Sequence, residues 1–215
     1  MGTMKAKPSI EGITNQAALE DLLYQTLETE LGGVEVYTAA VEAAARDDLK
    51  KEWRKYLKQT RRHVTIARDM LTTLGLDPDQ ETPARLFVRR TGEALVANIR
   101  KAIAESEPKV AQLVAAEAVC QAETKDHLDW ELVKELSKRA TGDVGKMLRY
   151  AVDEVESEED EHLYHTQGWA RELWLDAMGL PAVLPPPEES KDVETAIGAA
   201  RAKNARGPAA RRHAD

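Results

Sequence analysis

Histidines and glutamates are spaced in this sequence so that they could bind a metal ion inside a helical protein. Glu159 and His162, in the stretch ESEEDEHLYH, are one helical turn apart and therefore share one face of a helix. Glu30 and His63 lie at similar chain distances from the turn near Asp47, so they face each other if the two segments pair antiparallel. Carboxylates combined with few imidazoles suit iron or manganese better than zinc, which more often recruits thiolates or further histidines.

Heptad spacing predicts that these groups point into a core. Steps of three and four residues connect each of them to apolar residues on both sides. The three seams are Leu23, Leu27, Glu30, Val34, Tyr37 and Val41; Leu49, Trp53, Tyr56, Thr60, His63, Ala67, Met70 and Leu74; and Leu148, Val152, Val155, Glu159, His162, Thr166, Trp169 and Leu173. A carboxylate buried alone costs several kcal/mol, so it must be neutralised, hydrogen-bonded or bound to a cation. A metal ion is the simplest compensation, and a hydrogen-bonded core pair without metal is the alternative.

A fourth segment offers two competing seams. One contains Leu113, Ala116, Cys120, Glu123, His127 and Trp130, and the other contains Val110, Leu113, Glu117, Cys120, Thr124 and His127. His162 lies about 20 residues beyond the turn at Gly142, so the residue that faces it should lie about 20 residues before that turn. This level favours Glu123 over Glu117 as a ligand. His127 lies one turn further along the same face and is predicted as an additional ligand, with a hydrogen bond to Glu123 as the alternative.

Five helical segments position these residues. Thr82 with Pro83, and Pro108, are typical of helix starts, whereas Gly75 and Pro78 end a helix. The predicted helices cover residues 16–45, 48–74, 83–104, 108–140 and 144–178. Short turns pair the first with the second and the fourth with the fifth as antiparallel hairpins. We expect an all-α four-helix bundle with an extra crossover helix, in which the second hairpin begins where the first begins.

Composition narrows the class of protein. A net charge of −8 over 215 residues disfavours nucleic acid as a partner, because phosphate binding needs a positive surface. Cys120 is the single cysteine, which excludes a disulfide within the chain and a zinc motif of paired cysteines. The absence of a long apolar run argues against a membrane helix, and we expect a cytoplasmic protein. We expect residues 1–15 to be a flexible N-terminus, residues 16–178 to form the bundle, and residues 179–215 to be a Pro-rich linker with a peripheral or disordered tail.

The sequence resembles the ferritin-like superfamily of di-metal carboxylate proteins, which includes bacterioferritin, rubrerythrin and manganese catalase. The pattern of that superfamily is a glutamate on the first bundle helix, Glu-x-x-His on the second, a glutamate on the third and Glu-x-x-His on the fourth. The resemblance covers residues 16–178 and implies that the metal ligands are Glu30, His63, Glu123, Glu159 and His162, with His127 as a further candidate.

Thr60 departs from this pattern, because it stands where the second helix should supply a glutamate. A neutral hydroxyl cannot bridge two cations. Three outcomes are compatible with the sequence: His127 partly replaces the carboxylate, only the half-site of Glu30, Glu123, Glu159 and His162 binds, or the metal site is lost.

The resemblance implies one or two ions of iron or manganese that react with dioxygen or hydrogen peroxide, as in oxidase, peroxidase or catalase-type protection against oxidative stress, and a homodimer. The alternative is a non-enzymatic ferritin-like structural or interaction module with a degenerate metal site. We expect His165 to be exposed or to contact the site from outside, and Tyr37, Tyr56 and Trp169 to be core residues. The acidic residues that we expect on a solvated helix face are Glu156, Glu158, Asp160 and Glu161.

Overall fold

The computed structural model describes residues 10–187, and this part of the chain contains five α-helices and no strand. The helices are α1 (Gln16–Ala43), α2 (Asp47–Thr73), α3 (Pro83–Glu105), α4 (Pro108–Ser137) and α5 (Gly142–Ala177). The all-α prediction is confirmed, and each predicted helix agrees with an observed one to within a turn.

Local chemistry accounts for several of the helix ends. The Asn15 side chain accepts a hydrogen bond from the backbone N–H of Ala18 and so caps α1. Thr82 caps α3 in the same way through the N–H of Arg85, as the Thr82–Pro83 pair predicts. After α2 the chain turns at Gly75, whose φ of +76° lies in the left-handed region that favours glycine.

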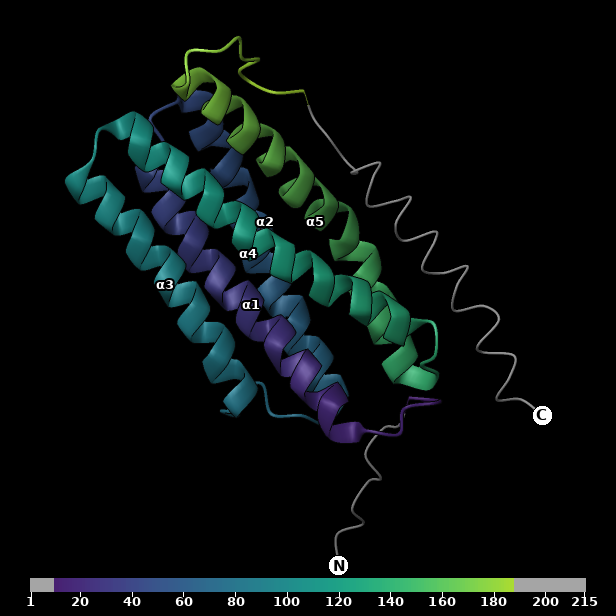
Figure 1. Ribbon diagram of the computed structural model, residues 1–215. Coiled ribbons are helices and arrows are strands. Elements are labelled where there is room, and N and C mark those ends of the chain that lie inside the picture. Colours follow the sequence, from purple (N-terminus) through teal and green to yellow (C-terminus); the bar gives the residue numbers. More distant parts are fainter. Residues whose placement is uncertain (1–9, 188–215) are drawn as a thin grey trace, which may run out of the picture.

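Four of the helices form a ring in which each contacts two ring neighbours. α1 packs against α2 and α4, and α5 packs against α4 and α2, while α3 lies outside the ring against α1 and α4 (Figure 1). α1 and α2 form one antiparallel hairpin, and α4 and α5 form the other. The chain therefore builds two hairpins and joins them by a helix that runs along the outside of the bundle.

The second hairpin begins beside the tip of the first, so our expectation that both hairpins begin at the same end is wrong. The side-chain oxygen of Gln112, near the start of α4, accepts hydrogen bonds from the backbone N–H groups of Ala45 and Arg46 at the α1–α2 turn (2.9 and 2.8 Å). Because α2 has already returned the chain to the end where α1 begins, a crossover that travels the whole bundle delivers it to the opposite end.

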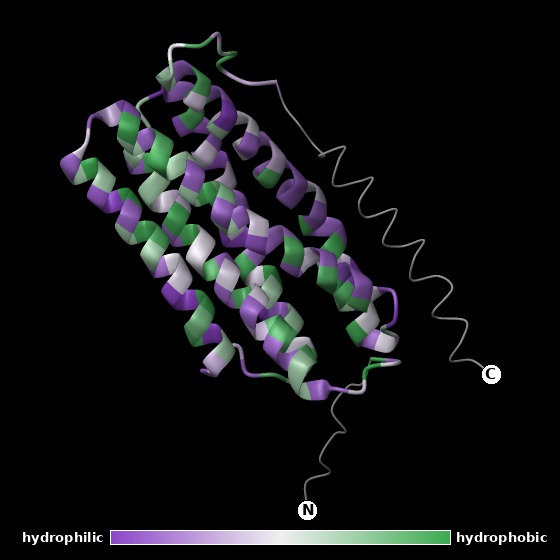
Figure 2. Ribbon diagram, viewed as in Figure 1, coloured by the Kyte–Doolittle hydropathy of each residue, from purple (hydrophilic) through white to green (hydrophobic). Residues whose placement is uncertain are grey.

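The interior consists of two apolar clusters with a polar layer between them. On every bundle helix the two clusters leave a gap of about two and a half to four turns, and the polar residues of the layer lie in this gap. The buried residues of this layer are Glu30, Thr60, His63, Glu123, Asp126, Glu159 and His162. Figure 2 shows the corresponding mixture of hydrophilic and hydrophobic residues along each helix. The apolar clusters shield the polar layer from water at both ends.

Buried charge fixes α3 to the bundle. Glu28 on α1 is almost fully buried and accepts from the guanidinium groups of Arg85 (2.8 Å) and Arg89 (2.6 Å) on α3. Further along, Gly32 and Gly92 allow the two backbones to approach closely. Because α1 contacts three helices, its buried face is wider than a single seam. Val34, which belongs to the predicted seam of this helix, is only half-buried.

The segments that flank the bundle are described in part. Ile10 is buried in the apolar cluster that contains the beginning of α1, although we assigned it to a flexible N-terminus. The expected tail beyond residue 187 lies outside the described residues. Among the described helices, none combines the length and the hydropathy that crossing a bilayer requires.

Candidate metal centre

Five of the six predicted ligands meet in the polar layer. Glu30 comes from α1, His63 from α2, Glu123 from α4, and Glu159 and His162 from α5, and each is at most 3% exposed. Two groups form, in which single donor atoms of all members lie within 4.8 Å of one another: Glu30, His63 and Glu159; and Glu123, Glu159 and His162. Glu159 belongs to both groups and therefore joins them into one centre.

The two imidazoles present their Nδ1 atoms to this centre. His63 Nδ1 lies 2.9 Å from Glu159 Oε1 and 3.6 Å from Glu30 Oε1. His162 Nδ1 lies 3.3 Å from Glu159 Oε1 and 3.7 Å from Glu123 Oε2. Neither Nδ1 makes a hydrogen bond of acceptable geometry with any described residue. Atoms that can bind one metal ion together show this pattern. They lie close to one another, but they point toward a common position and are not aligned for hydrogen bonds with each other.

The opposite nitrogen of each imidazole fixes its tautomer. His63 Nε2 lies 2.8 Å from Glu158 Oε2, and His162 Nε2 lies 3.2 Å from Gln59 Oε1. Carboxylate and amide oxygens only accept hydrogen bonds, so Nε2 carries a proton in each ring, and a neutral ring then has its lone pair on Nδ1. Gln59 also donates to Glu158, which ties the two outer partners together. Such partners hold a metal-binding histidine in the orientation and protonation state that a metal requires.

The carboxylates of the centre are poorly satisfied for buried groups. Glu30 Oε1 accepts from Trp130 Nε1 (2.7 Å), whereas Glu30 Oε2, Glu123 Oε2 and both oxygens of Glu159 have no hydrogen-bond partner among the described residues. Burial, reinforced by the charge of Glu159, raises the pKa of Glu30 and Glu123 well above the usual value. For Glu159, burial acts in the same direction, but His162 and His63 outweigh it and lower the pKa.

Aromatic rings close the centre on the side of the α1–α2 tip. The ring of Tyr56 lies 4.4 Å from that of His162 between centroids, and the ring of Tyr37 lies 5.9 Å from it. Both tyrosines and Trp169 are buried, in agreement with their prediction as core residues.

Thr60 is buried in the layer but takes no ligand role in this geometry. Its hydroxyl donates to the backbone carbonyl of Tyr56 one turn earlier (3.0 Å), and its methyl group faces Gly33 on α1. The position that would carry a glutamate in the superfamily pattern therefore contributes no donor to the centre.

His127 lies outside both ligand groups. Its Nε2 is 2.8 Å from Asp160 Oδ1, and its side chain is 12% exposed at the α4–α5 contact. The hydrogen bond to Asp160 raises the pKa of His127 above its usual value. The structure does not bring this predicted ligand to Glu123 or to the other four.

Asp126 occupies the inward position of α4 instead. It is 4% exposed and lies one turn from both Glu123 and Trp130, the residue that donates to Glu30. Sequence spacing allowed this result, because steps of three and four lead from Glu123 to Trp130 through Asp126 as readily as through His127. The observed seam of α4 runs through Ala116, Val119, Glu123, Asp126, Trp130 and Val133. Glu117, the rejected alternative to Glu123, is exposed and accepts from Trp174 (2.9 Å).

The acidic face of α5 is less solvated than expected. Glu156, Glu158, Asp160 and Glu161 are all half-buried, and Glu158 binds both His63 and Arg62. Glu158 and Gln59 are therefore functional candidates that spacing alone did not single out, since both lie beside the seam and not on it.

His165 is buried and not exposed. Its Nδ1 lies 2.9 Å from the Tyr56 hydroxyl and 3.6 Å from Glu52 Oε1. With Glu52 and Glu161 it forms a third carboxylate–histidine group at the α2–α5 contact. Glu161 in that group is already paired with Lys55 (2.5 Å), so part of its charge is compensated.

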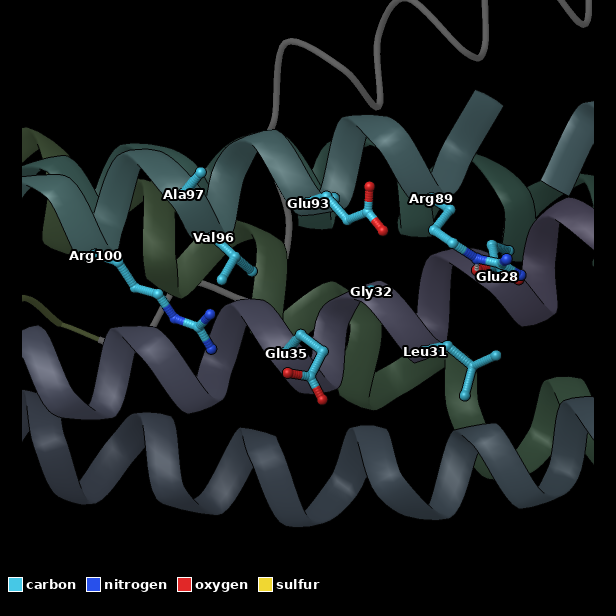
Figure 3. A pocket seen from close by; sticks show the side chains of 10 residues that line it. Glu28, Leu31, Gly32, Glu35, Arg89, Glu93, Val96, Ala97 and Arg100 are labelled. Atoms are coloured by element: carbon cyan, nitrogen blue, oxygen red, sulfur yellow. Dashed lines mark hydrogen bonds and ion pairs between the residues drawn. The ribbon is translucent and has the colours of Figure 1, made fainter. Parts of the chain in front are cut away.

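Three cavities flank α3, and none of them is lined by a ligand of the centre. One, of about 770 Å³, is an open groove between α1 and α3 (Figure 3). Arg89 and Arg100 extend from α3 toward α1, and Glu35 and Glu93 line the same groove, so its lining carries both signs of charge. Another, of about 190 Å³, lies between α1, α3 and α4 and is mainly apolar. The third, of about 340 Å³, lies between α3 and α4.

Comparison of the chain with protein-family models, with curated proteins and with solved structures found no match. The functional conclusion therefore rests on the geometry of the polar layer.

Proposed function

We propose that this chain is a ferritin-like protein that binds iron or manganese in its buried polar layer and that the bound metal reacts with dioxygen or hydrogen peroxide. The main observation behind this proposal is that His63 Nδ1, His162 Nδ1 and the unpartnered oxygens of Glu159 converge on one buried region. The order of the candidate ligands along the helices, and a crossover helix between two hairpins, support the ferritin-like part of the proposal.

Charge compensation supports a cation over a hydrogen-bonded core. Among residues 10–187, Arg85 is the one buried lysine or arginine, and its charge is matched by Glu28. The carboxylates of the centre therefore have no lysine or arginine beside them, and protonation alone would leave several of their oxygens without partners. A divalent ion would neutralise the charge and satisfy the oxygens at once.

In this proposal Glu30, Glu123 and Glu159 are the anionic ligands and His63 and His162 the neutral ones. Glu158 and Gln59 keep each imidazole in the Nδ1-binding tautomer. The two apolar clusters exclude bulk water from the layer. The bound metal would supply the redox chemistry toward the oxidant, and the chain supplies the anionic, enclosed site.

The first experiment measures metal content. The purified protein is reconstituted under anaerobic conditions with Fe(II), Mn(II) or Zn(II) in separate samples, and bound metal is measured after removal of excess. We expect Fe(II) or Mn(II) to bind to the natural chain and not to Glu159→Ala or His162→Ala. Asp153→Asn, an exposed change on the same helix, is the matched control and should bind as the natural chain does. Less than about a tenth of an ion per chain in the natural protein contradicts the proposal.

The second experiment tests reactivity. Fe(II)-loaded protein is mixed with dioxygen or with hydrogen peroxide, and the growth of Fe(III) absorbance is compared with that of free Fe(II) and of Asp153→Asn. Oxidation no faster than that of free Fe(II) with both oxidants would leave a metal-binding protein without the proposed reaction.

A non-enzymatic structural or interaction module remains the second candidate, because Thr60 supplies no carboxylate. It predicts no metal binding in any sample. The expected homodimer is part of the first proposal and is tested by light scattering coupled to size-exclusion chromatography.

A further inference from the structure

Asp126 is a buried acid of the polar layer that the five-residue centre does not use. Its Oδ1 has no hydrogen-bond partner among the described residues, although the side chain is only 4% exposed. A buried, unpartnered carboxylate oxygen is costly, so its presence requires either a proton with a suitable acceptor or a cation.

The neighbours of Asp126 place it on the side of Glu30. It precedes Trp130 by one turn of α4, and the Trp130 indole donates to Glu30 Oε1 at 2.7 Å. Glu123 lies one turn before Asp126 on the same face. Burial, and then the charges of Glu30, Glu159 and Glu123, raise the pKa of Asp126 well above its usual value. As the structure stands, Asp126 belongs to neither ligand group. Unlike His127, which is bonded to Asp160, it has a buried, unpartnered oxygen that can be turned toward the ion.

The half of the centre that contains Glu30 and His63 is also the half that lacks a carboxylate. Thr60 lies one turn before His63, and its hydroxyl is bonded to its own helix backbone. The group of Glu30, His63 and Glu159 is therefore short of one anionic donor compared with a Glu-x-x-His arrangement.

The number of negative charges in the polar layer also favours Asp126 as a ligand. Glu30, Glu123, Asp126 and Glu159 supply four negative charges when ionised, which balance two divalent cations, whereas the three glutamates alone would not. Asp129, one turn further along α4, is equally buried but differs, because Lys125 binds both of its oxygens (2.5 Å each) and Thr29 donates to it (3.0 Å). The charge of Asp129 is thus compensated locally and that of Asp126 is not.

We propose that Asp126 is a metal ligand on the Glu30–His63 side of the centre and supplies the carboxylate that Thr60 does not. This inference rests on the proposed metal-binding function. It implies that two divalent ions bind per chain, and that the one shared by Glu30, His63 and Glu159 requires Asp126.

The test compares metal stoichiometry and Mn(II) electron paramagnetic resonance of the natural chain, Asp126→Asn, and the matched control Asp129→Asn. We expect about two Mn(II) per chain, with a magnetically coupled spectrum, for the natural chain and for Asp129→Asn. Asp126→Asn should bind about one Mn(II), with the spectrum of an isolated ion, because the group of Glu123, Glu159 and His162 remains intact.

Folding of the variants is measured first by thermal melting without metal. Asp126→Asn should melt at or above the temperature of the natural chain, since it removes a buried charge, and Asp126→Leu provides a second variant of similar volume. Two coupled ions in either Asp126 variant would overturn the assignment while leaving the proposed function intact. No metal in the natural chain would instead overturn the proposed function itself.

Discussion

At the scale of single residues, the orientation of the two histidines decides what the polar layer can bind. Glu158 and Gln59 accept from the Nε2 atoms of His63 and His162 and leave both Nδ1 atoms directed at Glu159. Without these acceptors either imidazole could turn or adopt the other tautomer, and the same residues would form an ordinary hydrogen-bonded core.

The partner of His63 provides a residue-scale prediction. Glu158→Gln should weaken metal binding by about 10- to 100-fold while leaving the number of ions at saturation unchanged, because it affects the orientation of a ligand and not a ligand itself. Competition with a chelator of known affinity measures the change. Glu156→Gln, on the same helix and paired with Lys134 at the surface, is the control and should keep the affinity of the natural chain.

The raised pKa values of Glu30 and Glu123 give a pH prediction. In the metal-free protein these groups bind protons more tightly when folded than when unfolded, so stability falls as pH rises from about 4.5 through the raised pKa values. The melting temperature of the metal-free protein should therefore fall as the pH rises above about 4.5. His127, whose pKa is also raised, contributes in the same direction.

The variant Glu123→Gln separates these contributions. It removes one titrating carboxyl group but leaves His127 and Glu30, so its melting temperature should depend less steeply on pH than that of the natural chain. Equal slopes in the two proteins would show that Glu123 is not protonated preferentially in the folded state.

At the scale of the elements, a buried ion pair between Glu28 on α1 and Arg85 on α3 holds α3 against the bundle. Arg85 is 4% exposed and is bonded to Glu28 as well as to the backbone carbonyls of Pro78 and Gln80 (2.8 and 2.9 Å). It therefore joins the start of the crossover helix, the preceding loop and α1. Glu28 lies two residues before Glu30 on α1 and points toward α3.

Breaking that ion pair should be strongly destabilising. Arg85→Met leaves Glu28 buried with only the partly exposed Arg89 beside it, and we expect a loss of about 3–5 kcal/mol in the free energy of unfolding. Urea unfolding measures the loss. The double variant Glu28→Gln with Arg85→Met removes the uncompensated charge and should recover a large part of it, whereas a purely additive double variant would contradict this account.

At the scale of the whole molecule, the two apolar clusters separate the candidate metal centre from both ends of the bundle, so metal binding should be coupled to folding. An ion that binds only the folded chain stabilises it by about 2.7 kcal/mol at a free concentration 100 times the dissociation constant. Thermal melting with and without Mn(II) should therefore show a clear rise for the natural chain and none for Glu159→Ala. Equal rises in both proteins would indicate binding elsewhere, for example at the group of Glu52, Glu161 and His165.

The arrangement of the helices was predictable where a single seam dominated. In α2 and α5 every residue of the predicted seams is buried, because apolar residues on both sides of the polar pair allow only one rotation of the helix. The placement of His63, Glu159 and His162 toward the interior follows from that rotation.

Elsewhere spacing left a choice that only tertiary contacts could make. Along α4, Asp126 and His127 fit the same steps, and packing against both α1 and α5 turned Asp126 inward and paired His127 with Asp160. The start of the second hairpin, in contrast, could have been deduced from the sequence. An antiparallel first hairpin returns the chain to the end where α1 begins, so a crossover along the whole bundle must deliver it to the opposite end.

The sequence by itself determined an all-α chain, the limits of its helices and the inward rotation of α2 and α5, since helix propensity, caps and heptad periodicity act over neighbouring residues. The tertiary structure alone decided that Glu159 serves both ligand groups, that Glu158 and Gln59 orient the imidazoles, and that Asp126, and not His127, is buried in the polar layer. These relations join residues on different helices. Their distances follow from how side chains pack across the bundle, which periodicity along one helix does not encode.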